Sequence, residues 1–141
     1  MVDIGAGDGA LVAPLLAAGA RVIAVELHPG RARRLIDRFG EDITVVRADA
    51  RDLRLPRRPF RVVANPPWDI TEPLLRRLLH ASSRLERADL LLKRSAANRS
   101  VQAHRPGQFD LSLGPTVPRR AFRPSPPIDG RVLIARRGRR P

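Results

Sequence analysis

The tetrapeptide Asn65-Pro66-Pro67-Trp68 combines residue types that suit the binding of a flat, amine-bearing base. The Asn65 side-chain oxygen can accept a hydrogen bond from an exocyclic amino group. Pro66 and Pro67 fix φ and donate no backbone hydrogen bond, so their carbonyl oxygens lie on a stiff turn. The Trp68 ring offers a face on which a base can stack, a contact worth roughly 1–3 kcal/mol. A proline turn followed by a core tryptophan is the alternative, and the tetrapeptide alone does not separate the two.

A glycine-rich turn near the N-terminus is the second candidate binding element. An apolar strand over residues 2–4 precedes Gly5, Gly7 and Gly9, and a helical segment over residues 10–18 follows. Glycine permits positive φ and lets a ligand approach the backbone closely. The spacing Asp-x-Gly-x-Gly-x-Gly is not the Gly-x-Gly-x-x-Gly of a dinucleotide site, and no Lys-Ser/Thr pair follows, which excludes a P-loop.

Four successive predicted strands each end in a polar or glycine-rich element. After the glycine turn, Glu26, Asp49 and Asn65 follow the strands that end at residues 25, 48 and 64. A carboxylate some 20 residues beyond the glycine turn is where doubly wound folds hold ribose hydroxyls. An ordinary solvated acid is the alternative for Glu26. Because ligands bind outside the carboxyl ends of the strands in an open α/β sheet, we expect these side chains to lie around one site.

The rest of the chain alternates strand and helix, which favours a parallel sheet with helices on both faces. The pattern predicts helices over 29–39 and 74–79, a strand over 88–92, an ambiguous helix or loop over 94–106, and antiparallel closing strands over 109–117 and 131–135. We predict one domain over residues 1–135 and a disordered basic tail over residues 136–141.

In the order of its motifs the chain resembles the Erm-type 23S rRNA adenine N6-methyltransferases, relatives of the small-subunit rRNA adenine dimethylases. The stretches that carry the resemblance are residues 2–7, 25–29, 47–50, 59–67 and the proline-rich 118–129. The glycine turn is shared by most class I methyltransferases, and the Asn-Pro-Pro-aromatic motif also serves DNA adenine and protein glutamine methyltransferases. The proline-rich stretch is the part that points to rRNA adenine.

The resemblance implies a class I S-adenosylmethionine-dependent methyltransferase: a Rossmann-like, mostly parallel sheet with an antiparallel closing hairpin. The cofactor-binding residues that it implies are Asp3, Gly5, Gly7, Glu26, Asp49, Ala50 and Asn65. Glu26 would hold the ribose and Asp49 the adenine amino group of the cofactor, with the glycines beneath its methionine portion. Phe122 would close over the target base together with Trp68; a core phenylalanine is the alternative for Phe122.

The predicted chemistry is direct methyl transfer, with Asn65, Pro66 and Trp68 as the catalytic residues. The lone pair of an adenine N6 is delocalised into the ring, so the amine is a poor nucleophile. If the Asn65 side-chain oxygen and the Pro66 carbonyl accept its two hydrogens, the lone pair localises toward the sulfonium methyl. Trp68 would stack the base in a near-attack position and favour the sulfonium charge. The base must be unpaired or flipped out to reach such a pocket.

Composition favours an acidic partner. The 141 residues include 27 Lys+Arg and 14 Asp+Glu, a net charge of +13. Such a field attracts polyanions, and arginine stacks on bases and forks onto phosphates. A GC-rich genome that prefers arginine is a partial alternative. The chain has no cysteine, and its three histidines lie in separate segments, so we predict no metal site. With no signal peptide or membrane span, we expect a cytoplasmic monomer whose partner is 23S rRNA.

The sequence departs from the family in two respects. Trp68 stands where most members have tyrosine or phenylalanine, a change that keeps the stacking face. The first predicted strand is clipped at Met1, so a basic arm and a Gln-Asn segment that the family places upstream are missing, as is its helical C-terminal RNA-contacting domain. We therefore expect the chain as given to bind the cofactor weakly.

Three interpretations follow. The first is methylation of an adenine N6 in 23S rRNA, which gives macrolide-lincosamide-streptogramin resistance. The second is another Asn-Pro-Pro-aromatic enzyme that acts on DNA adenine or on protein glutamine. The third is a catalytically inactive, truncated remnant that keeps an RNA-binding surface. The proline-rich stretch favours the first over the second, and the missing N-terminal segments favour the third.

Overall fold

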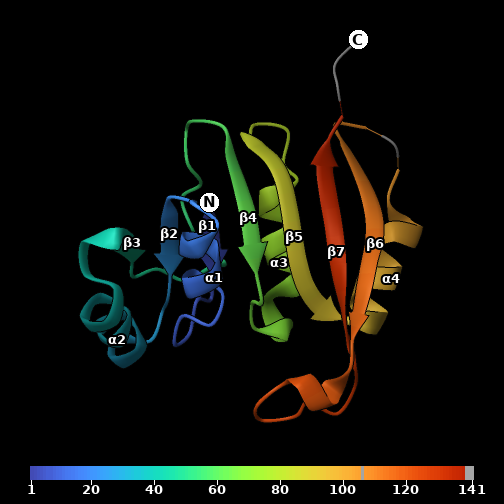
Figure 1. Cartoon of the computed structure of the whole chain (residues 1–141). Coiled ribbons are helices and arrows are strands. Elements are labelled where there is room, and N and C mark those ends of the chain that lie inside the picture. The colour runs from blue at the N-terminus through green and yellow to red at the C-terminus, as the bar shows by residue number, and fades with distance from the viewer. Residues whose placement is uncertain (106, 139–141) are drawn as a thin grey trace.

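Seven strands form one sheet in the order β3-β2-β1-β4-β5-β7-β6 (Figure 1). The structure is a computed structural model, and it describes residues 1–105 and 107–138. The strands are β1 (Val2–Ile4), β2 (Val22–Val25), β3 (Ile43–Val46), β4 (Phe60–Ala64), β5 (Leu85–Lys93), β6 (Phe109–Val117) and β7 (Gly130–Arg137). The α-helices are α1 (Val12–Ala17), α2 (Pro29–Phe39), α3 (Thr71–Leu78) and α4 (Arg94–Ala103). Short 3₁₀ turns span Gly40–Asp42, Trp68–Ile70 and Arg119–Ala121.

Strands β1 to β5 pair in parallel, whereas β7 pairs antiparallel with both β5 and β6. The hairpin of β6 and β7 therefore closes one edge of a sheet that is otherwise parallel. This arrangement confirms the predicted fold class. The parallel register brings the carboxyl ends of β1, β2, β3 and β4 to the same edge of the sheet, and the predicted site residues follow those ends.

The helices cover both faces of the sheet, which is also as predicted. Alternate residues of β2 enter two separate core clusters: Val22 and Ala24 pack with Val12 of α1 and Leu35 of α2, whereas Val25 packs in the larger cluster. That larger cluster contains the apolar faces of α3 and α4, which lie behind the sheet in Figure 1. In the described part of the chain, no helix has the length and apolar character that crossing a membrane requires.

Helix α2 begins directly after the polar end of β2. His28 caps it, since its Nδ1 accepts hydrogen bonds from the backbone N–H groups of Gly30 and Arg31 at 3.1 and 3.3 Å. Pro29 occupies the first helical position, and Gly40, at a φ of +53°, ends the helix. The cap fixes the direction of the first helical turn and so places Arg31 near the end of β2.

The ambiguous stretch after β5 is largely helical, because α4 occupies residues 94–103; Pro106, its last predicted residue, lies outside the described residues. Strand β5 begins three residues earlier than predicted, because its first residues pair with β4 and β7 rather than forming a loop.

The predicted start of the basic tail is wrong. Arg136 and Arg137 belong to β7, where Arg137 pairs with Phe109 of β6. The Arg137 guanidinium lies 4.6 Å from the centre of the Phe109 ring, and its Nε donates to the Leu85 carbonyl at 2.7 Å. These contacts extend the strand beyond its apolar residues. Residues 139–141 of the predicted tail lie outside the described residues.

Candidate active site

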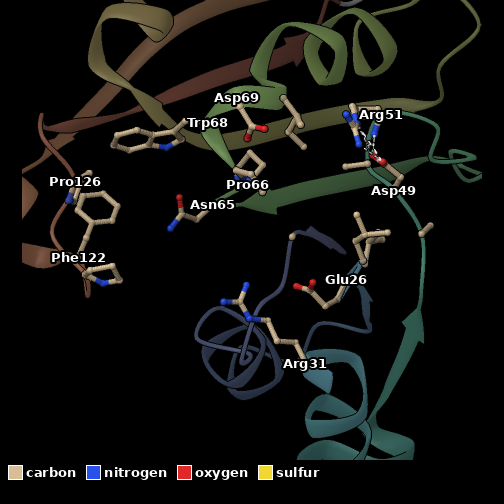
Figure 2. A pocket seen from close by; sticks show the side chains of 18 residues that line it. Glu26, Arg31, Asp49, Arg51, Asn65, Pro66, Trp68, Asp69, Phe122 and Pro126 are labelled. Carbon is tan, nitrogen blue, oxygen red and sulfur yellow. Dashed lines mark hydrogen bonds and ion pairs between the residues drawn. The ribbon is translucent and has the colours of Figure 1, made fainter. Parts of the chain in front are cut away.

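A cavity of about 450 Å³ lies where the carboxyl ends of the parallel strands meet the loop between β6 and β7 (Figure 2). Most of the predicted site residues line it: Gly5, Glu26, Asp49, Ala50, Asn65, Pro66, Trp68 and Phe122. Asp3 and Gly7 do not line the cavity. Asp3 is buried in β1, and Gly7 supports a residue of the cavity wall. The structure therefore brings together residues from five separate segments of the sequence.

The glycine turn is in direct contact with the tetrapeptide. Gly5 has a φ of +75°, and a Cβ added there would lie 3.0 Å from Cδ of Pro67. The backbone N–H groups of Gly5 and Ala6 both donate to the Val25 carbonyl, at 2.8 and 3.0 Å. Glycine is required at position 5 for two independent reasons, the positive φ and the close approach of Pro67.

The family resemblance implies S-adenosylmethionine as the ligand of this cavity, and we expect Gly5→Ala to weaken its binding about tenfold, because the turn must move away from Pro67. Gly19→Ala is the matched control: Gly19 has a similar φ of +79°, but nothing lies within 4 Å of an added Cβ. Both variants should lose roughly 1–2 kcal/mol of folding stability from the left-handed conformation. Calorimetric titration with the cofactor separates them, and equal affinities for the two variants would contradict the steric role of Gly5.

Glu26 is held in a fixed orientation although it lines the cavity. Only 6% of the residue is exposed, and its two carboxylate oxygens accept hydrogen bonds from the backbone N–H groups of Gly7 and His28, each at 2.8 Å. The acid thus joins the glycine turn to the start of α2. The solvated-acid alternative for Glu26 does not fit this burial. Its role on a ribose stays a prediction.

Asp3 is a buried acid that the cavity does not reach. The residue is 1% exposed, and neither carboxylate oxygen has a hydrogen-bond partner among the described residues. Burial, together with the nearby negative charge of Glu26, raises the pKa of Asp3 to about 7. Asp3 thus lies behind the glycine turn rather than in the cavity wall. Its predicted contact with the cofactor stays a prediction.

Asp49 is paired with an arginine that the sequence analysis did not single out. The Arg51 guanidinium contacts both carboxylate oxygens, the shortest distance being 2.6 Å, and the Arg51 backbone N–H donates to the same carboxylate at 2.8 Å (Figure 2). These hydrogen bonds lower the pKa of Asp49 to about 2. The carboxylate is therefore ionised at any working pH and can accept hydrogen bonds only. Its role on an adenine amino group stays a prediction.

Asn65 lies in the middle of the cavity. Figure 2 shows its side chain between the Trp68 and Phe122 rings on one side and Glu26 with Arg31 on the other. Asn65 is exposed and the following Pro66 is buried, so the amide is accessible while the turn behind it is packed. The chain thus presents one neutral hydrogen-bonding side chain between an aromatic and a charged part of the same cavity.

The two aromatic rings of the cavity contact each other edge to face. The centres of the Trp68 and Phe122 rings are 5.8 Å apart at an interplanar angle of 78°, and Trp68 Nε1 donates to the Leu91 carbonyl at 3.3 Å. In this geometry a base can stack on one ring but cannot be sandwiched between the two. Phe122 lines the cavity, so the structure does not place it in the main core.

The loop that carries Phe122 is anchored at its two ends. The Asp129 carboxylate accepts a hydrogen bond from the Arg119 backbone N–H at 2.9 Å, and Ser125 Oγ donates to the Arg119 carbonyl at 2.9 Å. A Cβ added at Gly130 would lie 3.0 Å from Cζ of Phe122. The absence of a side chain at position 130 leaves the room that the Phe122 ring occupies.

Sequence reasoning missed several residues of the cavity wall. Arg31 and Leu27 lie beside Glu26, and Leu27 is 54% exposed although it is apolar. Leu27 directly follows Glu26, which was itself singled out, whereas Arg31 lies in the first turn of α2 and has no such signal. Pro124 and Pro126 also line the cavity from the loop, as the proline-rich stretch suggested in general but not by residue. Within residues 1–105 and 107–138, no group of three or more metal-ligating side chains is placed to hold a metal ion.

Comparison with known proteins gives consistent matches over nearly the whole chain. The family model for ribosomal RNA adenine dimethylase matches residues 1–139. The mycinamicin-resistance protein MyrB of Micromonospora griseorubida is 34% identical over 144 residues, which cover 97% of this chain and 46% of MyrB. An rRNA adenine N-6-methyltransferase of Corynebacterium diphtheriae is 35% identical over 146 residues, covering 97% of this chain and 57% of that protein. The chain thus spans about half the length of these curated relatives.

Solved structures match at the level of the fold. The crystal structure of the 23S rRNA methyltransferase ErmE superposes with a TM-score of 0.86 at 26% identity, covering 99% of this chain and 62% of that chain. A dimethyladenosine transferase from Plasmodium falciparum superposes with a TM-score of 0.80 at 21% identity, covering 97% of this chain and 55% of that one. The second match supports the fold alone.

Proposed function

The chain belongs to the ribosomal RNA adenine dimethylase family, and from that membership we propose that it transfers a methyl group from S-adenosylmethionine to the N6 amino group of an adenine in 23S rRNA. Among the relatives, MyrB is named for mycinamicin resistance and ErmE is described as a 23S rRNA methyltransferase. We extend the proposal to macrolide-type resistance for that reason. The observation that carries it is the position of Asn65 between the aromatic and the charged ends of one cavity.

The charged end of the cavity fits the cofactor. Glu26 presents a fixed, buried carboxylate suited to ribose hydroxyls, and the ionised Asp49 is an acceptor suited to an adenine amino group. The exposed side chain of Leu27 supplies an apolar surface next to Glu26. When bound, S-adenosylmethionine supplies an electrophilic methyl group on a sulfonium. Glu26 and Asp49 would hold its nucleoside, with Leu27 against the base.

The aromatic end of the cavity fits the target adenine. The Trp68 ring would stack the base, with Phe122 at its edge, and the Asn65 oxygen and the Pro66 carbonyl would accept the N6 hydrogens. Acceptance of both hydrogens would favour a pyramidal nitrogen, whose lone pair is no longer conjugated with the ring and can point toward the methyl group. The methyl carbon would bond to the nitrogen as its bond to sulfur breaks, and the sulfur would leave as a neutral thioether. The alkylated nitrogen then loses a proton readily to water, so no strong base is required of the chain.

The test is expression of the protein in a macrolide-sensitive bacterium that has no such methyltransferase. We expect digests of its 23S rRNA to contain a new N6-methylated adenosine by mass spectrometry, and the minimal inhibitory concentration of a macrolide to rise. An Asn65→Ala strain serves as the control and should show neither change. New N6-methyladenine in DNA, or methylglutamine in protein, would instead favour another Asn-Pro-Pro-aromatic enzyme. No heat of S-adenosylmethionine binding in calorimetry would favour the inactive remnant.

A further inference from the structure

A second and larger hollow, of about 930 Å³, lies beside the candidate active site and is lined by arginines. We call it the arginine groove and define it by its six arginines, Arg51, Arg54, Arg57, Arg76, Arg77 and Arg84. They come from the loop between β3 and β4, from the last turns of α3 and from the residue just before β5. Among the described residues, no aspartate or glutamate lines this hollow. The predicted function gives none of these residues a role of its own. They enter it only as part of the net positive charge of the chain.

Half of this positive charge is compensated within the protein. Arg51 pairs with Asp49 at 2.6 Å and Arg76 with Glu72 at 2.9 Å. Arg77 contacts Asp52 at 3.5 Å. These three acids stand around the groove but do not line it.

The other half is not compensated. Among the residues that the structure describes, Arg54, Arg57 and Arg84 form no ion pair. All three are exposed and face one hollow, so their charges repel one another and concentrate an attractive potential for anions there. Arginine forks onto phosphate with two parallel hydrogen bonds, so these side chains are suited to phosphate groups in particular.

The walls of the groove are held together by Arg77. Its Nε donates to the Arg51 carbonyl at 3.0 Å, and a terminal nitrogen donates to the Leu53 carbonyl at 3.1 Å. Arg77 therefore ties the loop between β3 and β4 to α3. The free guanidinium groups of Arg54 and Arg57 are carried by a loop that is anchored at its start.

The groove and the candidate active site share one wall residue, Arg51. Arg51 lines the first cavity next to Asp49 and also lines the arginine groove. A ligand that occupies both hollows must be long, carry negative charges at intervals, and present a base at one point. A polynucleotide strand has these properties, and a small phosphate compound does not.

We propose that the arginine groove binds the backbone phosphates of the RNA strand that flanks the target adenine, with Arg54, Arg57 and Arg84 as the contacts. This inference rests on the proposed function and names how the same site holds its substrate. Contacts to phosphate position a nucleic acid without reading its sequence. The groove therefore sets the direction in which the strand leaves the base pocket, while base choice belongs to the pocket itself.

The test compares two variants that lose the same charge. In the groove variant Arg54, Arg57 and Arg84 are each replaced by glutamine. In the control variant, glutamine replaces Arg21, Arg99 and Arg105. These three arginines are also exposed, and they line neither hollow. Binding is measured by fluorescence anisotropy with a labelled single-stranded RNA of about 20 nucleotides, at several salt concentrations. For single strands, the slope of log K against the logarithm of salt concentration is about 0.7 in magnitude for each phosphate contact.

We expect the groove variant to bind this RNA about tenfold or more weakly and its salt slope to fall by about 2, as the loss of three phosphate contacts requires. The control should keep both values, and cofactor affinity should be unchanged in both variants. Equal losses in the two variants would overturn the proposal, because net charge alone would then explain the binding.

The two measurements distinguish a failure of the proposed RNA contacts from a failure of the proposed methyl transfer. If the wild-type protein binds RNA through the groove but methylates no adenine, the proposed function is wrong and the proposed binding of RNA by the groove is supported. If the wild-type protein methylates RNA and the groove variant does so with an unchanged KM and salt slope, the proposed binding of RNA by the groove is wrong and the proposed function is supported.

Discussion

Replacing Asn65 with alanine is expected to lower kcat for methyl transfer by about 10²–10³-fold, the range seen when one preorganised hydrogen-bonding group is removed from an active site. The alanine variant lacks the oxygen that accepts an N6 hydrogen, so the amine keeps its lone pair in the ring. Asn65 is exposed, and its loss should leave the fold intact. Single-turnover kinetics with a short RNA substrate give the rate of transfer directly.

The cofactor affinity of the Asn65→Ala variant should change by less than about threefold, a difference of well under 1 kcal/mol. Asp69→Ala is the matched control, because Asp69 is also an exposed polar residue that lines the same cavity but has no role in the proposed transfer. Its kcat should remain near that of the wild type. An Asn65→Ala enzyme with full activity would exclude the lone-pair mechanism, whatever the fate of the control.

Replacing Asp3 with asparagine is expected to stabilise the protein at pH 8 by up to about 4 kcal/mol, the free energy that corresponds to a pKa raised from 3.8 to about 7. In the unfolded chain Asp3 ionises near 3.8, whereas in the folded chain burial and Glu26 delay ionisation to about 7. The stability due to neutral Asp3 is therefore complete below pH 4 and is lost as the pH rises through 7. The asparagine amide does not ionise in this pH range and should not show that decline.

Thermal unfolding between pH 4 and pH 8 checks this prediction. The Asp3→Asn variant and the wild type should have similar melting temperatures near pH 4, and the gap between them should widen toward pH 8. Asp42→Asn is the control, because Asp42 is an exposed acid and its replacement should leave the pH dependence of the wild type in place. Parallel melting curves for Asp3→Asn and the wild type at every pH would show that Asp3 is not a buried neutral acid.

The candidate site could be predicted from sequence to the extent that it depends on strand ends. Glu26, Asp49 and Asn65 each follow an apolar run, and a parallel sheet brings such positions to one edge whatever the details of packing. Arg51 could not be found in this way, because its place depends on how a loop folds back onto Asp49. The isolation of Asp3 also depends on the packed interior and has no signal in the local sequence.

The limits of the strands depended on contacts between distant segments. Apolar alternation ends near Ala135, yet β7 continues to Arg137, because backbone pairing with β6 and the Phe109 ring stabilise two charged residues there. The resemblance to the methyltransferase family supplied the roles of the site residues, whereas periodicity supplied only their positions. The arginine groove had no signal beyond composition, since its six arginines are spread over 34 positions of the chain.

The contact between Gly5 and Pro67 has a consequence for how such a protein can diversify. Because the glycine turn and the Asn-Pro-Pro turn touch, the proposed function implies that these two turns at strand ends set the separation between the methyl donor and the acceptor amine. The loop between β6 and β7 and the arginine groove lie outside this contact. On the proposed function, exchange of the arginine groove between relatives should therefore change how the RNA strand is held, while the rate of transfer to a seated base stays unchanged.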